Sequence, residues 1–515
     1  MGHATRLGVP EPVQGSPAST VRVPSGAMRI AMLASECEPF AKTGGLADVV
    51  DALARALGAR GHEVDVYLPR YRGLAAPPDA ETVRLQVPLG SDPAAGRSEA
   101  FERVPVKLVS GPGNGYRLRL VEHDPSFARA GLYGDASGDY PDNGARFTLL
   151  GRAALEAMRA EARPVDVLHG HDWQAGPGIL SLRSRYAHDP LLSRIVTVMT
   201  CHNLAYHGWV PRDRAWSLDL PAVIGDHAGV DLLREAVRVA DLVNTVSPTY
   251  ARESLTPEYG AGLDDILRSR GDRYVGIMNG VDPQLWDPAN DPALAASYSA
   301  ADPGGKAACR DDLCARLGID PDGPVMGVIG RLDPQKGFDL VSWAAPGLID
   351  AGGRLVVLGT GDHTLVEGLR SLAEARPDRV AILERFDRDE ARRIYAGSDI
   401  FLMPSRFEPS GQGQLIAMRY GTVPLVRSTG GLVDTVVDAD ADPAAGNGFR
   451  FGAADPMALL DAAARAIAAF RDRPRWARIV RRGMLADHSW DGPAASYEAA
   501  YATVMEQTAA APDRT

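Results

Sequence analysis

Two loops of this sequence combine cationic side chains with glycines. The segment GRLDPQKG at 330–337 places Arg331 and Lys336 five positions apart, and a second segment places Lys42 directly before Thr-Gly-Gly at 43–45. Glycines let a ligand approach backbone amides closely, and fixed cations beside such amides suit a diphosphate, either bound or departing as a leaving group. The alternative is a pair of solvated loops with incidental charges. We predict that Lys42, Arg331 and Lys336 contact a phosphorylated substrate.

Lysine is scarce in this chain, which adds weight to two of these positions. Of 55 lysine and arginine residues, only Lys42, Lys107, Lys306 and Lys336 are lysine. A coding bias towards arginine explains the skew, but ammonium and guanidinium groups are not interchangeable where a compact charge must fit. Lys42 and Lys336 are therefore predicted to be kept for their geometry. Lys107 is predicted to lie on a strand surface, and Lys306 stays ambiguous.

A third segment, at 404–414, combines a carboxylate with a glycine-containing turn. Glu408 precedes Pro409 and the residues Ser-Gly-Gln-Gly at 410–413, whose backbone amides open a predicted helix near 414–420. Carboxylate oxygens accept hydrogen bonds from sugar hydroxyls, and amides at a helix N-terminus bind phosphate oxygens. The segment is therefore predicted to bind a sugar phosphate. The alternative is that Ser410 caps the helix and Glu408 compensates its dipole.

Histidine and aspartate patterns in the chain do not predict a metal site. His169 and His171 are spaced as metal ligands can be, but no third ligand has a convincing spacing. His202 ends an apolar strand, where a single histidine is more often structural. The D-x-D pattern at 438–442 follows a predicted helix, and we interpret it as a solvated loop. No metal or other cofactor is expected, because the two cationic loops already supply the charge that a metal would bring.

These segments lie between elements that alternate strand and helix. Residues 29–35 form an apolar strand, residues 46–57 a helix and residues 63–68 the next strand, which together predict a βαβ unit of a parallel sheet. A second series contains a strand at 325–329 that ends in the second cationic loop. The predicted fold class is α/β, with two Rossmann-like doubly wound domains that face a central cleft and join near residues 270–283.

Each predicted domain carries one copy of the pattern TGGLxDxV. The copies occupy residues 43–50 and 429–436, and in each the glycines follow a strand end and open a helix. The free amides and the positive end of the helix dipole make such a turn favourable for an anion. Open α/β sheets bind ligands at the carboxyl ends of their strands, so both turns are predicted to face the substrate.

Composition excludes several other classes of protein. The formal net charge of −11 over 515 residues argues against a nucleic-acid binder, and no apolar run is long enough to cross a membrane. The four cysteines cannot form a disulfide framework, which fits a reducing cytoplasm. Residues 1–27 are rich in Pro, Gly, Ser and Thr and lack the apolar stretch of a secretory signal, so we interpret them as a disordered extension.

The ordered motifs resemble those of bacterial glycogen synthases and the related plant starch synthases. The resemblance rests on KTGGLADVV at 42–50, HDW at 171–173, HNLAY at 202–206, VSPTY at 246–250, NGVD at 279–282, GRL at 330–332, QKG at 335–337 and PSRFEP at 404–409. It implies a retaining hexosyltransferase with the GT-B fold that moves glucose from ADP-glucose to the non-reducing end of an α-1,4-glucan, without a metal. ADP-glucose and the glucan are then its partners, with no nucleic acid and no membrane; the oligomeric state is not indicated.

The resemblance also implies roles for individual residues. Lys42, Arg331 and Lys336 match contacts to the donor diphosphate, in agreement with their charge. His202, Asn279 and Glu408 match residues around the transferred glucose, Asp172 and Trp173 match positions that line the cleft, and Phe386 falls beside the nucleotide base. The candidate catalytic residues are Glu408, His202, Lys42, Arg331 and Lys336, and the candidate substrate-binding residues are Gly44, Gly45, Asp48, Asp172, Trp173, Asn279, Phe386, Ser410, Gly411, Gln412, Gly413 and Thr429.

Some positions depart from the family pattern. Ser410 stands where the family usually has Cys, Gln412 replaces a common Leu, and His207 occupies a position where Gln is frequent. Ser410 keeps a small hydroxyl donor, so we expect altered donor binding without loss of activity.

The resemblance and the strand pattern together divide the chain into four parts. They are the extension at 1–27, an acceptor-side domain at 28–275, a nucleotide-sugar domain at 276–488, and a helix returning to the first domain plus a tail at 489–515. Two other functions stay open from the sequence. One is a transferase that uses UDP-glucose or makes a small glucoside, and the other is a catalytically silent glucan-binding protein.

Overall fold

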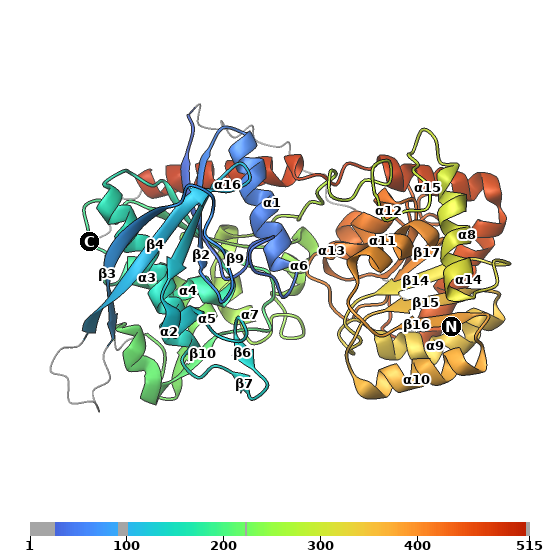
Figure 1. The fold of residues 1–515 in the computed structure, drawn as a ribbon, viewed down its shortest axis with the longest axis horizontal. Helices are drawn as coiled ribbons and strands as arrows, with labels where there is room; N and C mark the ends of the chain where they lie inside the picture. The colour runs from blue at the N-terminus through green and yellow to red at the C-terminus, as the bar shows by residue number, and fades with distance from the viewer. Residues whose placement is uncertain (1–25, 91–100, 222–223, 511–515) are drawn as a thin grey trace, which may run out of the picture.

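The computed structural model describes residues 26–90, 101–221 and 224–510. The predicted extension at 1–27 falls outside these residues except for its last two positions, and the end of the predicted tail, 511–515, falls outside them as well. Two sheets form two lobes that lie side by side (Figure 1). The limits of the four predicted parts stay a prediction, but the strands of the first sheet all precede residue 277 and those of the second all follow residue 324.

The first sheet is built on a parallel core. Its strand order is β13-β12-β9-β8-β1-β2-β5-β4-β3, and every neighbouring pair from β13 to β5 is parallel. The order changes direction between β1 and β8. The strands are β1 (Arg29–Leu33), β2 (Glu63–Pro69), β3 (Glu81–Gly90), β4 (Phe101–Pro112), β5 (Arg117–Glu122), β8 (Val167–His171), β9 (Val196–Cys201), β12 (Leu242–Thr245) and β13 (Tyr274–Gly276).

One edge of this sheet is antiparallel, whereas the βαβ pattern predicts a purely parallel sheet. Strand β4 runs antiparallel to both β5 and β3, so two long strands extend the parallel core. Strand β3 begins with exposed residues and then alternates partly between exposed and buried ones. Such a strand suits an antiparallel edge with one solvated face, whereas the parallel strands are buried on both faces.

Helices cover both faces of the first sheet. Their apolar residues recur at helical spacing, so each helix has an apolar side that packs against the sheet. Helix α1 buries Val49, Val50, Leu53 and Leu57 against one face. The helices are α1 (Leu46–Ala59), α2 (Asp124–Phe127), α3 (Asn143–Glu161), α4 (Asp172–Arg183), α5 (Leu232–Val239), α6 (Pro248–Glu253) and α7 (Asp264–Ser269). Short elements complete the lobe: β6 (Gly134–Asp135), β7 (Gly138–Asp139), β10 (Trp209–Pro211), β11 (Gly229–Asp231) and the 3₁₀ turns Arg212–Leu218 and Gly271–Arg273.

The second sheet is parallel throughout, with strand order β16-β15-β14-β17-β18-β19. This is the doubly wound order, which changes direction between β14 and β17. The strands are β14 (Val325–Ile329), β15 (Arg354–Leu358), β16 (Val380–Leu383), β17 (Ile400–Met403), β18 (Val423–Arg427) and β19 (Phe449–Phe451). The helices are α8 (Gly305–Leu317), α9 (Phe338–Asp350), α10 (His363–Ala375), α11 (Arg388–Gly397), α12 (Gly413–Arg419), α13 (Gly430–Thr435), α14 (Pro456–Arg471) and α15 (Arg473–Leu485).

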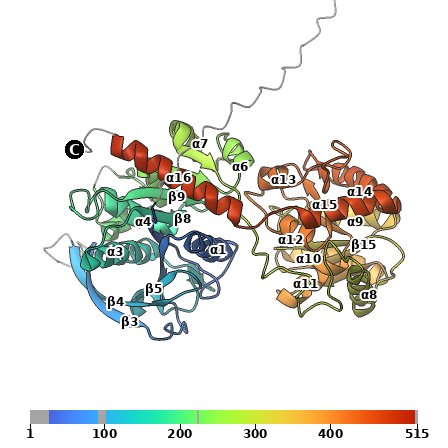
Figure 2. The same cartoon turned by 90° about the horizontal axis from the view of Figure 1, so that it is seen from above.

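After α15 the chain returns to the first lobe. Helix α16 (Asp491–Ala510) crosses over β8 and β9 (Figure 2) and buries Ala494, Tyr497, Tyr501 and Val504 in the same apolar cluster as α1. The returning segment lies beside the outgoing one, since Val281 N–H donates to the carbonyl oxygen of His488 at 2.7 Å. In the described part of the chain, no helix combines the length and apolar character that a bilayer crossing requires.

Candidate active site

The loops that carry most of the predicted site residues follow the strands at which each sheet changes direction, whereas Asn279, Phe386 and Thr429 follow β13, β16 and β18. In the first domain they follow β1 and β8, with His202 after the neighbouring β9; in the second they follow β14 and β17. Ligands of doubly wound domains bind outside the carboxyl ends of such strands. The fold therefore gathers segments that are hundreds of positions apart into two sets of loops.

In the second domain, Lys336 and Glu408 form a direct ion pair. The Nζ atom of Lys336 donates to both carboxylate oxygens of Glu408, at 2.7 and 3.0 Å, and Ser405 Oγ donates to the same carboxylate at 2.9 Å. Glu408 is buried, so its charge needs these partners. The structure thus joins two predicted catalytic residues from different loops.

Gly337 explains how the two loops come so close. Its φ is +73°, in the left-handed region, and a Cβ atom there would lie 2.2 Å from the carbonyl oxygen of Pro404. Only glycine allows the β14 loop to rest on the β17 loop at this point. Lys336 is consequently held within reach of Glu408.

Arg331 lies apart from this ion pair. Its side chain is 60% exposed and contacts Asp333, at 3.4 Å, and Gln335. Phe386, which follows β16, is 83% exposed. Neither side chain is fixed by packing, so both are free to adjust to a ligand at the open edge of the domain.

Ser410 does not cap the helix that follows the turn at 410–413, contrary to the alternative considered from the sequence. Helix α12 has Gln412 at its N-cap and no side-chain cap, while the hydroxyl of Ser410 is buried without a hydrogen-bond partner in the described part of the chain. Capping by Ser410 is therefore wrong, because its hydroxyl does not reach an amide of α12. The turn is held instead by Gln414, whose Nε2 donates to the carbonyl oxygens of Ser410 and Gly411, and Gly413 begins the helix.

In the first domain, Lys42 lies among acidic side chains. It donates to Asp48 of α1 and lies 3.4 Å from Glu38, which also pairs with Arg388 of the second domain at 3.0 Å. Burial raises the pKa of Asp48, and the hydrogen bond from Lys42 opposes that rise. The predicted diphosphate contact on this side is thus a lysine oriented by carboxylates of its own loop and helix.

Glu36 is a buried residue that sequence reasoning missed. Its carboxylate accepts from the amides of Thr43 and Gly44 and from the hydroxyls of Thr43 and Tyr133. The glutamate fills the anion-binding turn that the first TGGL copy predicts. Its position directly after the strand predicted at 29–35, three residues beyond the end of β1, is the signal in the sequence that could have indicated it.

The second TGGL copy corrects a prediction about exposure. Its amides do not point outward: the N–H of Gly430 donates to both oxygens of Glu253 from α6, at 3.1 and 3.0 Å, and Thr429 Oγ1 donates to the same carboxylate. Thr429 is fully buried there. The turn is occupied by the other domain, because α6 and α13 pack against each other.

Asp172 and His202 come together after β8 and β9. Asp172 begins α4 with a φ of +56°, and its carboxylate accepts from the amides of His202, at 2.7 Å, and Asn203, at 3.4 Å. Burial raises the pKa of Asp172 to about 7, although the two amide hydrogen bonds lower it. Asp172 thereby fixes the backbone that carries His202.

Trp173 is held mainly by packing. Its ring meets Phe147 edge-on, with centroids 5.2 Å apart, and a Cβ at Gly208 would lie 2.2 Å from it. The ring of Trp173 therefore lies between Phe147 and the loop after β9 and supports that loop. Asn279, on the segment joining the domains, is buried, and its Oδ1 atom has no partner among the described residues.

Several other predictions can be placed. Lys107 lies exposed on β4 and pairs with Glu122. Lys306 is half-buried and structural, donating to the carbonyl oxygens of Ala396 and Tyr420 and to Thr422 Oγ1 at 2.8 to 2.9 Å. Burial lowers its pKa to about 8.

The solvated-loop interpretation of the D-x-D pattern is wrong for its first residue. Asp438 is buried, accepts from the amide of Arg450 and pairs with Arg465 at 3.2 Å. It is a structural carboxylate between β19 and α14. The described residues contain no group of three or more His, Cys, Asp or Glu side chains arranged to hold a metal ion.

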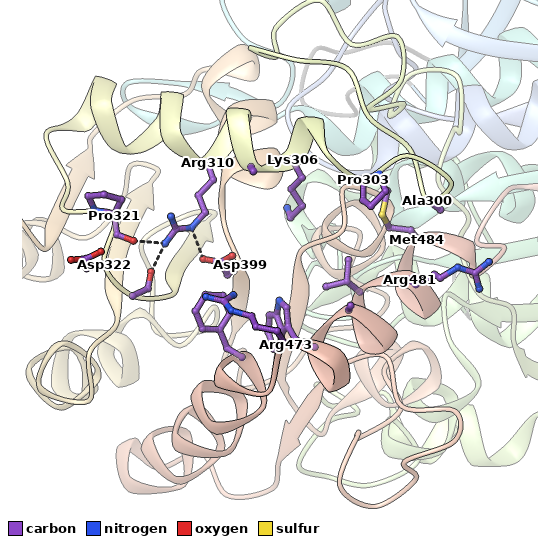
Figure 3. Close-up of a pocket in the computed structure, with 16 residues that line it drawn as sticks. Ala300, Pro303, Lys306, Arg310, Pro321, Asp322, Asp399, Arg473, Arg481 and Met484 are labelled. Atoms are coloured by element: carbon purple, nitrogen blue, oxygen red, sulfur yellow. Dashed lines mark hydrogen bonds and ion pairs between the residues drawn. The ribbon is translucent and has the colours of Figure 1, made fainter.

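A pocket of about 670 Å³ lies in the second domain, away from the predicted site residues. Lys306 and Arg310 extend toward it from α8 (Figure 3), and Phe470, Trp476 and Met484 form part of its apolar wall. Arg310 donates to Asp399 and to the carbonyl oxygen of Pro321, so its charge is already compensated.

Two α/β domains, each with a core of parallel strands, and their cationic loops define a glycosyltransferase with the GT-B fold, and comparisons with known proteins agree. The family model described as "Starch synthase catalytic domain" matches residues 29–269, and the one described as "Glycosyl transferases group 1" matches residues 310–482.

Similar proteins show to which family of glycosyltransferases the chain belongs. A glycogen synthase of Anaeromyxobacter dehalogenans (strain 2CP-C) is 45% identical over 488 residues, covering 93% of this chain and 100% of the relative. Glycogen synthase 2 of Geobacter sulfurreducens is 43% identical, with 92% and 98% covered. The catalytic domain of starch synthase IV from Arabidopsis thaliana, solved with ADP and acarbose, has a TM-score of 0.83 at 32% identity, with 93% and 100% covered. The chain belongs to the glycogen synthase family and is a hexosyltransferase.

Proposed function

We propose that this enzyme transfers glucose from ADP-glucose to the non-reducing end of an α-1,4-glucan in the cytoplasm, with retention of the anomeric configuration and without a metal ion. The observation that carries the proposal is the ion pair of Lys336 with buried Glu408, which sets a cation and a sugar-binding carboxylate side by side. The ADP and acarbose in the Arabidopsis enzyme support a nucleotide donor and a glucan acceptor.

In the proposed mechanism the cations act on the leaving group. Closure of the domains brings Lys42 from one side and Arg331 with Lys336 from the other onto the diphosphate. Each cation stabilises the charge that develops on the phosphate as the glycosidic carbon becomes oxocarbenium-like.

The carboxylates and the histidine act on the sugar. Each of the three cations contacts a carboxylate of its own domain: Lys42 with Asp48, Arg331 with Asp333 and Lys336 with Glu408. A bound diphosphate would compete for the cations and leave Glu408 to accept from glucose hydroxyls. Retention then follows from attack by the acceptor 4-hydroxyl on the face that the phosphate leaves. The new glycosidic bond forms as the bond to the phosphate breaks, the hydroxyl proton passes to the leaving phosphate, and His202 lies beside the positive sugar.

The test is a donor and primer comparison on the purified full chain. We expect ADP release and glucan growth with ADP-glucose plus glycogen, unchanged by a chelator, and new linkages that α-amylase cleaves. Faster turnover with UDP-glucose, or product formation without a glucan primer, would favour the alternative transferase. Absence of nucleotide release with any donor would favour a silent glucan-binding protein.

A further inference from the structure

Three histidines form a row beneath the predicted sugar site. His169 and His171 lie on β8 and are fully buried, and half-buried His202 follows β9. The rings of His169 and His171 have centroids 4.1 Å apart, and those of His171 and His202 lie 5.3 Å apart. Nothing in the proposed mechanism uses the first two rings.

All three rings are neutral at physiological pH. Burial lowers the pKa of His169 and of His202 to about 3 and that of His171 well below its ordinary value, with further lowering of His171 by the neighbouring rings. A neutral imidazole carries one N–H and one lone pair, so the hydrogen bonds decide which nitrogen holds the proton.

The proton of His169 is assigned by its neighbours. The amide nitrogen of Asn244 faces the carbonyl oxygen of Thr245, so Asn244 Oδ1 accepts from the hydroxyl of Thr200 at 2.6 Å. Having donated its only hydrogen, Thr200 Oγ1 accepts from His169 Nε2, at 2.6 Å. His169 Nδ1 then holds a lone pair, which accepts from the hydroxyl of Tyr501 on α16 at 2.8 Å.

The proton of His171 follows from a different constraint. Its Nδ1 lies 3.0 Å from Nε2 of His202, while its own Nε2 is buried without a partner among the described residues. A buried N–H without an acceptor is rarer than a buried lone pair without a donor. The hydrogen of His171 therefore lies on Nδ1 and donates to Nε2 of His202.

We propose that His171 is a positioning residue that holds His202 with its hydrogen on Nδ1, so that His202 offers an N–H donor to the bound sugar. The inference rests on the proposed function, which puts His202 beside the transferred glucose. Asp172 fixes the backbone of His202, and His171 fixes its ring. The position of the ring, and which of its nitrogens carries the hydrogen, are therefore set before substrate binds.

Two substitutions of His171 separate this role from packing. His171→Phe keeps most of the ring volume but removes the donor, and we expect kcat/KM to fall at least about tenfold. His171→Asn keeps an N–H near the position of Nδ1 and should recover most of the activity. Equal losses in the two variants would overturn the proposal.

A double-mutant cycle tests whether His171 acts through His202. In a His202→Ala background, His171→Phe should lower kcat/KM no further, because the group it orients is gone. The same fold-loss in both backgrounds would indicate a general packing effect and contradict the proposal. Tyr501→Phe is the matched control: it removes a hydrogen bond in the same row without touching the donor to His202, so stability should fall while kcat stays within about twofold.

A spectroscopic measurement keeps the inference independent of the substrate. In histidine-labelled protein, the nitrogen-15 shifts of His202, assigned by their loss in His202→Ala, should be pyrrole-type at Nδ1 and pyridine-type at Nε2. The reverse pattern overturns the inference, whichever donor the enzyme uses. A correct pattern in a protein that rejects ADP-glucose would refute the proposed function and leave the tautomer assignment standing.

Discussion

The two TGGL copies share a local sequence and differ in what surrounds their glycines. At Gly44 and Gly45 an added Cβ would meet no described atom within 4 Å. At Gly430 it would lie 2.0 Å from the carbonyl oxygen of Glu408, and at Gly431 2.1 Å from that of Ser410. The first copy thus has open space above its glycines, although Glu36 already accepts from the amide of Gly44, whereas the second copy supports the loop that carries Glu408.

The acidic residues of the two copies differ in the same way. Asp48 of the first copy contacts Lys42 within its own domain. Asp434 of the second copy accepts from Ser247 Oγ at 2.8 Å, Thr249 N at 3.0 Å and Thr249 Oγ1 at 2.6 Å, all in the first domain. Because Glu253 at the end of α6 binds Gly430 in return, α6 and α13 cap each other across the domains. The acidic residue of the first copy is bound within its own domain, and that of the second joins the domains.

The largest expected effect is the difference between substituting a glycine of the second copy and substituting one of the first. Gly431→Ala forces the Ser410 backbone to move, so we expect kcat to fall about a hundredfold and the free energy of unfolding to fall by about 1–3 kcal/mol. Gly45→Ala should lower activity only, with an unchanged melting temperature, because its Cβ meets open space. Kinetics and thermal unfolding of both variants check the contrast. Equal stability of the two proteins would show that the second copy is not packed as described.

Next come the two lysines that face the diphosphate in the proposed mechanism. Lys42→Arg and Lys336→Arg should each lower turnover at least about tenfold, or about 1.4 kcal/mol in transition-state binding, although each keeps its charge. Lys107→Arg, on the surface of β4, is the control and should be neutral. Near-normal kinetics in both site variants would refute the idea that these lysines are kept for their geometry.

A smaller effect is expected at the contact between domains. Asp434→Ala removes three hydrogen bonds that join the domains, so the radius of gyration from small-angle scattering should rise and kcat should fall about twofold to fivefold. Asp48→Ala, at the matching position of the first copy, should leave the radius of gyration unchanged. A rise in both variants would mean that the two copies do not differ in this role.

The smallest effect concerns pH. Burial raises the pKa of Glu253, so above the ordinary glutamate value of about 4.3 the folded protein holds a proton here more often than the unfolded chain. Stability from this group is then lost as pH rises towards the folded pKa. Glu253→Gln removes that loss, so its melting temperature relative to the parent should increase with pH, on the order of 1 °C. Melting curves between about pH 4 and 7 measure it, and a constant or falling difference would contradict it.

Much of the architecture could be read from local patterns. The alternation of strands and helices predicts both doubly wound domains, and the cationic loops fall at the strand ends where each sheet changes direction. Local patterns could not show contacts between residues that are far apart in the sequence. Glu253 and Gly430 are 177 positions apart, and nothing near either one indicates the other.

The same limit explains what was missed around the site. His171 gains its role from His202, and its neighbour His169 is hydrogen-bonded to Tyr501, which lies 332 positions further along the chain than His169. Trp173 matches a motif for a cleft residue, and that stays a prediction, but the motif does not show that Gly208 of the β9 loop lies directly against the ring. Residue types predicted the chemistry, whereas burial and partners depend on the tertiary fold.

Helix α16 has a consequence for how the protein is made. Tyr497 and Tyr501 complete the apolar cluster of the first domain, yet the ribosome adds them after the entire second domain. Domains usually fold in the order of their synthesis. Here the face of the first sheet under α16 stays uncovered until the second domain has been translated, so the domain that is begun first is the one that is finished last.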